Sequence, residues 1–308
     1  MTSPRKPLDP RITEQRNPRT AAIDLASPLE IVDLINAEDR SIADAVALQR
    51  EAIAHAIVLA ERTFRAGGRL FYVGAGTSGR LGVLDAAECP PTFGSDPEMV
   101  QGVIAGGLAA VTSAQEGAED RPQSARDDIA ERNVGANDFV IGIAASGTTP
   151  YVRAALGEAM RRGAATAIVA CSPPNDDLKR LVDVAIVPIT GPEVVTGSTR
   201  MKAGTATKLV LNTITTGAMI RMGKTFGNLM VDLRATNNKL KDRSERILME
   251  VCGVERKRAR ELLDEADGRV KIAIVMDKLG VGREEAARAL EEGGGVIRRV
   301  TREDPPPV

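Results

Sequence analysis

The sequence predicts an α/β fold: a doubly wound parallel sheet of five strands flanked by helices, followed by a small C-terminal helical bundle. Two observations predict the sheet, since short apolar runs rich in β-branched residues recur through the middle of the chain and helical patterns separate them. A third predicts the bundle, because the chain beyond residue 241 shows helical patterning alone. We therefore expect an arm and helix over residues 1–50, the sheet domain over 51–240 and the helical domain over 241–308.

The N-terminal part is expected to begin as an irregular arm and to continue as two helices. Residues 1–20 are rich in Pro, Arg and Asn. Residues 27–30, Ser-Pro-Leu-Glu, predict a helix start with a serine N-cap, a proline in the first turn and an acid at the third position. This helix is expected to reach about Glu38. Apolar residues at helical spacing then predict one longer helix over residues 41–66, ended by a pair of glycines.

Strand-like and helical patterns alternate in the middle of the chain. Apolar strands that alternate with helices are typical of a parallel sheet with both faces covered, and ligands of such sheets bind beyond the carboxyl ends of the strands. The expected strands are 69–73, 100–105, 138–144, 165–170 and 184–188, and the clearest helices between them are 120–133 and 150–162.

The composition excludes several classes of function. Basic and acidic residues number 41 and 42 among 308, so the charge does not favour nucleic acid or a membrane surface as a partner. No run approaches the roughly 18 apolar residues of a membrane span, and the first ten residues lack the apolar segment of a signal peptide. Cys89, Cys171 and Cys252 are odd in number and far apart, which favours a reducing cytoplasm over a disulfide framework or a zinc site.

Few kinds of side chain remain for acid–base chemistry. His55 is the one histidine and lies in an apolar helical pattern, so a metal site and histidine base catalysis are disfavoured. Aromatic residues are scarce, with five Phe, two Tyr and no Trp, which argues against a stacking platform for a sugar. Proton transfer is therefore expected from carboxylates, lysine or tyrosine, and we expect neither a metal nor a cofactor.

The most informative segment is the turn between the first strand and the next helix, Gly74-Ala-Gly-Thr-Ser-Gly79. Free backbone N–H groups and the helix dipole favour an anion at such a turn, so Gly76, Thr77 and Ser78 are expected to bind a phosphate. The turn also matches the dinucleotide fingerprint G-x-G-x-x-G, but the next apolar run ends in Gly106-Gly107 without the acid that holds a ribose. A compact phosphomonoester is therefore favoured over a dinucleotide and over a turn without a ligand.

Two further loops repeat this chemistry. The third strand ends in Ala145-Ser-Gly-Thr-Thr-Pro150, where a hydroxyl-rich turn again leads into a helix. The last strand is followed by Gly191–Ala206, which is rich in glycine, hydroxyls and charge. For either loop taken alone, ordinary helix capping explains the hydroxyls equally well. The residues of these loops expected to bind substrate or phosphate are Ser146, Gly147, Thr148, Thr149, Glu193, Ser198 and Lys202.

Two acidic positions are candidates for proton transfer. Glu88 follows the first loop and precedes Cys-Pro-Pro, where we expect its helix to end. An acid at a helix C-terminus opposes the dipole, which favours its protonated form and suits a general acid. Glu119 belongs to a second cluster, Glu116-Gly-Ala-Glu-Asp120, close to the start of an expected helix. Acids at that place are also ordinary complements of the helix dipole, so these residues alone leave a catalytic role open.

Long blocks of the sequence resemble one family. Gly74–Gly94 is similar to the signature of the N-acetylmuramic acid 6-phosphate etherases, members of the sugar isomerase (SIS) domain superfamily. The resemblance covers most of the chain, although the family often has arginine where this chain has Thr148. The other blocks that agree are Thr13–Asn17, Glu116–Asp120, Gly142–Gly147 with Thr149–Tyr151, Glu193–Ala206 and Phe226–Asp232.

The resemblance implies a carbon–oxygen lyase that converts N-acetylmuramic acid 6-phosphate and water into N-acetylglucosamine 6-phosphate and D-lactate, in the recycling of cell-wall amino sugars. In the family this reaction is an elimination followed by hydration. The family's two essential glutamates fall on Glu88, as proton donor to the departing lactate, and on Glu119, as the base that removes the C2 proton. The family also implies a SIS-type sheet and a homodimer with the site near the subunit interface.

Two other functions stay open. SIS domains also occur in regulatory proteins, so a non-catalytic sensor of sugar phosphates is one alternative, although a sensor does not need both Glu88 and Glu119. A ketose–aldose isomerase on the same fold is another, and it would interconvert hexose 6-phosphates without releasing lactate.

Overall fold

The computed structural model describes residue 9 and residues 11–232 and 238–307. The chain forms two compact units: the sheet unit, Met1–Ala87 with Glu98–Thr215, and the helical unit, Glu88–Pro97 with Thr216–Val308. These divisions differ from the expected boundaries after residues 50 and 240. Residues 1–8 and 10 of the expected arm lie outside the described part of the chain.

The sheet unit contains the five predicted strands, and all of them run parallel in the order β2-β1-β3-β4-β5. Gly74, the last residue of β1, pairs with Ile104 of β2 and Ile143 of β3, so the carboxyl ends of these strands lie level. The strand order reverses beside β1, which makes the loops after β1 and β3 the expected place for a ligand. The strands are β1 Leu70–Gly74, β2 Val100–Ile104, β3 Phe139–Ile143, β4 Ala165–Val169 and β5 Val184–Ile186.

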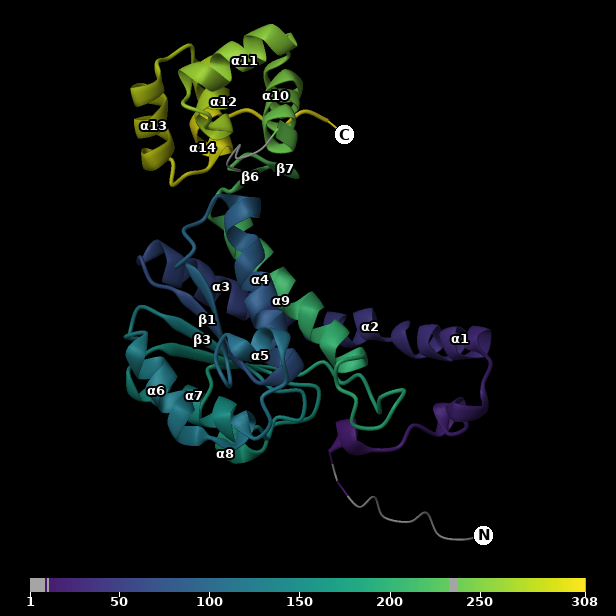
Figure 1. The fold of residues 1–308 in the computed structure, drawn as a ribbon. Coiled ribbons are helices and arrows are strands. Elements are labelled where there is room, and N and C mark those ends of the chain that lie inside the picture. The colour runs from purple at the N-terminus through teal and green to yellow at the C-terminus, as the bar shows by residue number, and fades with distance from the viewer. Residues whose placement is uncertain (1–8, 10, 233–237, 308) are drawn as a thin grey trace. The chain divides into compact units, whose positions relative to one another are not determined.

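Helices cover both faces of this sheet (Figure 1). Along β1 the side chains alternate, so Phe71 joins the apolar core under α6 and α7 while Tyr72 faces α4 on the other side. The Tyr72 hydroxyl and the Thr215 hydroxyl of α9 both donate to the buried carboxylate of Asp85 in α4, at 2.9 and 3.2 Å. Asp85 thus ties β1, α4 and α9 together. The covering helices are α3 Arg50–Arg65, α4 Gly76–Phe93, α6 Pro122–Glu131, α7 Pro150–Arg161 and α9 Lys202–Arg221.

The N-terminal helices agree with the prediction in one case and differ in another. α1, Pro28–Asp39, begins with the predicted capping box, in which Ser27 and Glu30 each bond the other's backbone N–H. The single helix expected over 41–66 is wrong, because α2, Ile42–Ala47, and α3 are separate helices. The side chain of Gln49 between them accepts the backbone N–H of Val187 at 2.9 Å, so this turn is joined to the chain after β5.

Short helices complete the sheet unit and lie mostly in its arm and loops. Three single 3₁₀ turns lie between residue 11 and α1, and such short turns explain why this part of the sequence shows no extended helical periodicity. These elements are η1 Ile12–Glu14, η2 Pro18–Thr20, η3 Ile23–Leu25, α5 Ala109–Thr112, η4 Ala118–Asp120 and α8 Asp176–Lys179.

The helical unit has its own apolar core, built mainly on the almost fully buried α12. The predicted helical bundle is confirmed, and a short antiparallel hairpin of β6 and β7 that the sequence did not predict precedes it. No helix of the described residues is long and apolar enough to cross a membrane. The elements are β6 Thr225–Phe226, β7 Leu229–Met230, α10 Asn238–Cys252, α11 Arg256–Glu265, α12 Val270–Leu279, α13 Arg283–Glu292 and α14 Ile297–Thr301.

Candidate functional site

Two strand–turn–helix loops on neighbouring strands build the candidate site. α4 begins at Gly76 directly after β1, and Gly76 has a positive φ of 53°, which suits glycine. α7 begins at Pro150 after the loop that leaves β3, and Gly147 in that loop has φ of 71°. Because β1 and β3 are adjacent and parallel, both helix N-termini open toward the same edge of the sheet. Their unpaired N–H groups make this edge favourable for an anion.

A pocket of about 380 Å³, here called the loop pocket, lies at this edge. Most of the predicted phosphate-binding residues meet in it: Gly76, Thr77 and Ser78 from the first loop, and Ser146, Thr148 and Thr149 from the second. Gly147 is buried and does not line the pocket, but its positive φ turns the second loop. The other lining residues are Arg11, Glu14, Ala75, Glu119, Asp120, Ala145, Pro150, Gly197 and Thr199.

Hydrogen bonds hold the hydroxyls of the second loop in place. The Ser146 and Thr148 hydroxyl oxygens are 2.9 Å apart, and the backbone N–H of Thr148 donates to Ser146 Oγ at 3.3 Å. Arg11 from the N-terminal arm donates from Nη1 to Thr148 Oγ1 at 3.3 Å. The loop therefore presents a chain of linked polar groups toward the pocket.

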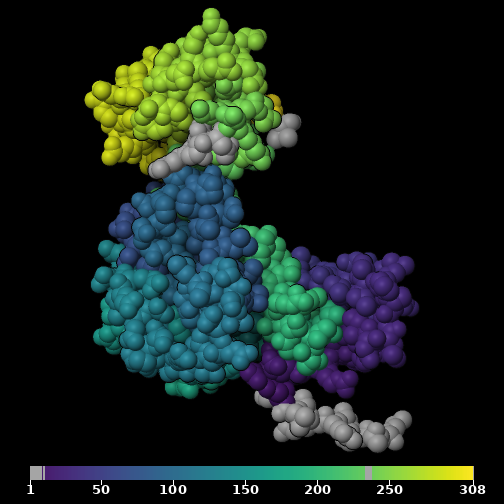
Figure 2. All heavy atoms as spheres, viewed as in Figure 1, coloured from purple at the N-terminus to yellow at the C-terminus, as the bar shows by residue number. Residues whose placement is uncertain are grey.

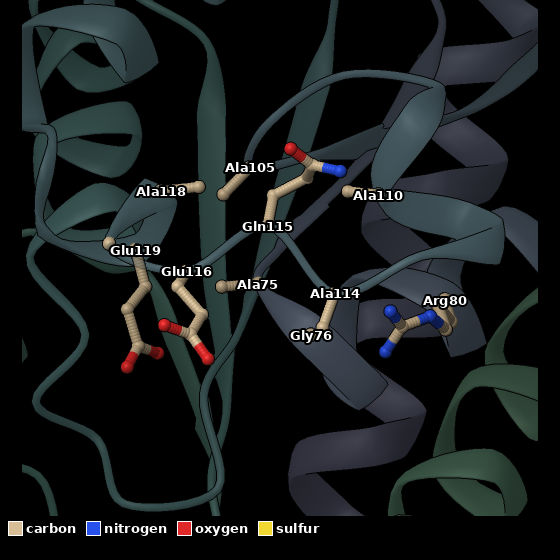
Figure 3. A pocket seen from close by; sticks show the side chains of 11 residues that line it. Ala75, Gly76, Arg80, Ala105, Ala110, Ala114, Gln115, Glu116, Ala118 and Glu119 are labelled. Atoms are coloured by element: carbon tan, nitrogen blue, oxygen red, sulfur yellow. The ribbon is translucent and has the colours of Figure 1, made fainter.

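A second cavity of about 290 Å³, the side pocket, adjoins the loop pocket. The two share Ala75, Gly76 and Glu119. Figure 3 shows the Glu116 and Glu119 side chains next to each other on one side of the side pocket and Arg80 on the other. Arg80 donates from Nε to the carbonyl oxygen of Val111 at 2.9 Å, which fixes its position. A ligand that spans both pockets would pass Glu119.

Glu119 is the acid best placed for chemistry on such a ligand. It lies in the single turn of η4, is exposed, and lines both pockets. Its neighbour Asp120 lines the loop pocket but not the side pocket. The family resemblance points to Glu119 as the base, and the structure distinguishes the two acids because Glu119 lines the side pocket and Asp120 does not.

Glu88 is not at the end of its helix, contrary to the prediction. α4 continues through the following proline pair to Phe93, because the carbonyl of Pro90 accepts the N–H of Gly94 at 2.9 Å and closes the last turn. The dipole argument for a protonated Glu88 therefore fails, since that effect is confined to the last turn. Glu88 is exposed, lines neither pocket, and lies about 18 Å along the helix axis from Gly76 at 1.5 Å per residue.

Three residues predicted to bind substrate in the third loop lie away from the pocket lining. Glu193 is fully buried and caps α9, since its two carboxylate oxygens accept the backbone N–H groups of Lys202 and Ala203 at 2.9 and 3.0 Å. Burial raises the pKa of Glu193. Lys202 Nζ pairs with Glu38 Oε2 at 2.7 Å, with both side chains buried. Ser198 is half-buried, and its neighbours on either side, Gly197 and Thr199, line the loop pocket instead.

The N-terminal arm contributes to the site, which the sequence analysis missed. Figure 2 shows the arm against the start of α9 and the loop before it, purple beside green. The Thr13 carbonyl accepts the N–H of Gly197 at 3.3 Å, and the Thr20 hydroxyl donates to the Val194 carbonyl at 2.8 Å. Arg11 and Glu14 of this arm line the loop pocket. Similarity of the Thr13–Asn17 block to the family was the one sign in the sequence that the arm mattered.

Glu38 joins the arm to α9, so its replacement by glutamine is expected to destabilise the sheet unit by about 3 kcal/mol at neutral pH. Lys202 would then keep a buried charge without its carboxylate partner. The guanidinium of Arg19, followed by Lys202, holds the pKa of Glu38 down at about 2, from an ordinary value of 4.5. Because the folded pKa is the lower one, this stabilisation is complete above the ordinary value and is lost as the pH falls toward 2.

The check is the free energy of unfolding of the wild type and Glu38→Gln in denaturant at several pH values. Their difference is expected to shrink as the pH falls from about 6 to about 3. Glu51→Gln is the matched control, because its carboxylate is 90% exposed, and it should unfold like the wild type throughout. A difference for Glu38→Gln that stays constant over this range would contradict the assignment.

Sequence and structure comparisons place these features among known proteins. Residues 52–160 match the model of the glucokinase regulatory protein N-terminal SIS domain. The chain is 54% identical over 294 residues to an N-acetylmuramic acid 6-phosphate etherase of Rhodopirellula baltica, covering 95% of this chain and 97% of that protein. It is 52% identical over 287 residues to one of Mycolicibacterium smegmatis, covering 93% and 96%. Phosphoheptose isomerase GmhA from Neisseria gonorrhoeae is a more distant structural neighbour, with 16% identity, a TM-score of 0.46, and coverage of 61% and 96%.

Proposed function

Since the chain belongs to the family of N-acetylmuramic acid 6-phosphate etherases, we propose that it cleaves the D-lactyl ether of its substrate at the junction of the loop pocket and the side pocket. The chain is a carbon–oxygen lyase, and its products are N-acetylglucosamine 6-phosphate and D-lactate. The observation that supports this placement is the meeting of two hydroxyl-rich helix starts around the loop pocket, with Glu119 as the acid that lines this pocket and the side pocket as well.

The phosphate is assigned to the loop pocket. Its oxygens accept hydrogen bonds from the N-terminus of α4, with the Thr77 and Ser78 hydroxyls, and from the second loop, with Ser146, Thr148 and Thr149. These hydrogen bonds fix the phosphate end of the open-chain sugar. The other end extends past Glu119 into the side pocket, which directs the reacting carbons toward a base.

Glu119 is assigned as the base that removes the C2 proton. In the ring-opened sugar the C1 aldehyde acidifies this proton, because the electron pair left on C2 delocalises into the carbonyl. The pair then forms the C2–C3 double bond as the C3–O bond to lactate breaks and an acid protonates the departing oxygen. Water adds to C3 of the unsaturated aldehyde and a proton returns to C2. The net change is water in and lactate out, which balances without an oxidant or reductant.

The acid that protonates lactate is assigned to Glu88 of a second copy of the chain. Glu88 and Gly76 lie about 18 Å apart along one helix, which is longer than a hexose phosphate, so one copy's Glu88 does not serve its own loop. Leu84 lies one turn earlier on the same helix face and is 52% exposed, as expected for a face that meets another chain. A homodimer with α4 of one copy facing the pocket of the other completes the site.

The remaining expectations follow from this role. The substrate is a small phosphorylated amino sugar, and we assign no nucleic acid or membrane as a partner. Cys89, Cys171 and Cys252 form no disulfide with one another, which is compatible with the proposed cytoplasmic location. Recycling of amino sugars from the cell wall is the process that supplies such a substrate.

The test is incubation of the purified protein with N-acetylmuramic acid 6-phosphate and enzymatic measurement of D-lactate and N-acetylglucosamine 6-phosphate. Equal amounts of both products are expected. Binding of the sugar phosphate without lactate release would indicate a sensor instead. Interconversion of an aldose phosphate with a ketose phosphate, again without lactate, would indicate an isomerase.

A further inference from the structure

We propose that Arg11 of the N-terminal arm binds the phosphate group of the substrate, as the positive charge of the loop pocket. The proposal rests on the proposed function for the identity of the substrate. It adds a binding residue from a segment far from both loops in sequence, since Arg11 and Thr148 are separated by 137 positions.

The charge of the pocket is the first argument. Arg11 is the one cationic side chain among the described residues that line the loop pocket, and Glu14, Glu119 and Asp120 line it as acids. The helix N-termini supply only partial positive charge. A phosphate dianion among three carboxylates therefore needs Arg11, whose guanidinium suits phosphate oxygens.

The orientation of Arg11 is the second argument. Asp9 accepts from Nε at 2.9 and 3.0 Å and also from Nη2, so the carboxylate occupies one edge of the guanidinium. Asp9 does not line the loop pocket. The opposite atom, Nη1, points to the second loop, where it donates to Thr148 Oγ1 at 3.3 Å. A phosphate held by Ser146 and Thr148 would lie within reach of the second N–H of Nη1.

The anchoring of the arm is the third argument. Thr13, two residues after Arg11, accepts the N–H of Gly197, and Asn17 donates from Nδ2 to the Pro192 carbonyl at 3.4 Å. These bonds fasten the arm to the loop before α9. Arg11 is therefore presented by a fixed wall of the pocket and loses little freedom when the phosphate binds.

The test compares Arg11→Ala and Arg11→Lys with the wild type in two assays: steady-state lactate release, and inhibition of that release by inorganic phosphate. Arg11→Ala is expected to raise KM and the inhibition constant of phosphate together, by roughly 10- to 100-fold, with kcat changed much less. Arg11→Lys should recover part of both. Arg16→Ala is the matched control, because Arg16 is an exposed arginine of the same arm that does not line the pocket, and it should match the wild type.

Two results would overturn the proposal. One is an unchanged inhibition constant of phosphate in Arg11→Ala. The other is a fall in kcat with equal losses for both Arg11 variants, which would mean that Arg11 only holds the arm in place. Binding of phosphate measured by calorimetry separates this proposal from the proposed function. If the wild type binds phosphate and Arg11→Ala does not, the assignment of Arg11 as a phosphate-binding residue holds even where no lactate is released.

Discussion

Glu119→Gln is expected to lower kcat for lactate release by about 10²- to 10⁴-fold while N-acetylglucosamine 6-phosphate still binds. Glutamine has the same shape but cannot take the C2 proton, whereas the phosphate contacts in the loop pocket remain. Glu119 lines both pockets, so in the proposed placement its carboxylate lies between the part of the substrate that carries the phosphate and the rest of the sugar. The measurement is kcat from initial rates together with calorimetric binding of the product.

Glu131→Gln serves as the matched control for this variant. Its carboxylate is exposed at the end of α6 and lines neither pocket, so kcat should equal that of the wild type. Asp120→Asn tests the neighbouring acid. It should affect KM more than kcat, because Asp120 lines the loop pocket but not the side pocket. If Glu119→Gln kept most of the wild-type kcat and Asp120→Asn lost it, the base would be Asp120.

Glu88→Gln is expected to lose lactate release to a similar extent, and mixing it with Glu119→Gln should restore about a quarter of the wild-type activity. Each site is assigned Glu119 from one copy and Glu88 from the other. A mixed dimer then has one site with both glutamates and one with neither. In an equal mixture half of the dimers are mixed, and each of these has one active site out of two. The expected activity is therefore a quarter of that of the wild type.

Co-expression of the two variants with different affinity tags isolates the mixed dimer, and its mass should be twice the 32.6 kDa of the chain. The isolated mixed dimer should show half the wild-type activity. An inactive mixed dimer would place Glu88 and Glu119 in the same site from one copy. A chain that stays monomeric and active would remove the second copy from the mechanism altogether.

The fold was largely predictable because local patterns decide it. The five strands are short apolar runs, fully buried in β1 and β3 and partly buried in the others, and a parallel sheet is the arrangement that buries such runs on both faces. The capping box at Ser27 is equally local. The break between α2 and α3 was not predictable, since it coincides with a hydrogen bond from Val187 to Gln49, 138 positions away.

The candidate site was predictable to the extent that it consists of strand–turn–helix loops. Thr77, Ser78, Ser146, Thr148 and Thr149 line one pocket because parallel strands carry their following loops to one edge of the sheet. Tertiary contacts decide the rest. Glu193 lies in a loop whose composition is typical of a binding site, and only the tertiary structure shows that its carboxylate caps α9.

The arm illustrates the same limit. Arg11 precedes a single 3₁₀ turn, and nothing in its neighbours predicts that it reaches a loop of the sheet. Glu88 is a different case. The resemblance gives it the role of an essential residue of the family, and we propose that it performs this role in a dimer rather than within one chain. A single chain shows where its helix ends and that Glu88 lines neither pocket, whereas the second copy that would complete the site is part of the proposed function.

The measurement that tests the central claim most directly is the isotopic content of the products formed in D₂O enriched in ¹⁸O. Elimination at Glu119 followed by hydration predicts one deuterium on C2 of N-acetylglucosamine 6-phosphate and no ¹⁸O in the hydroxyl of D-lactate, because the C3–O bond breaks and lactate keeps the ether oxygen. A product that retains its C2 hydrogen, or lactate that carries ¹⁸O, would contradict the mechanism and the role assigned to Glu119.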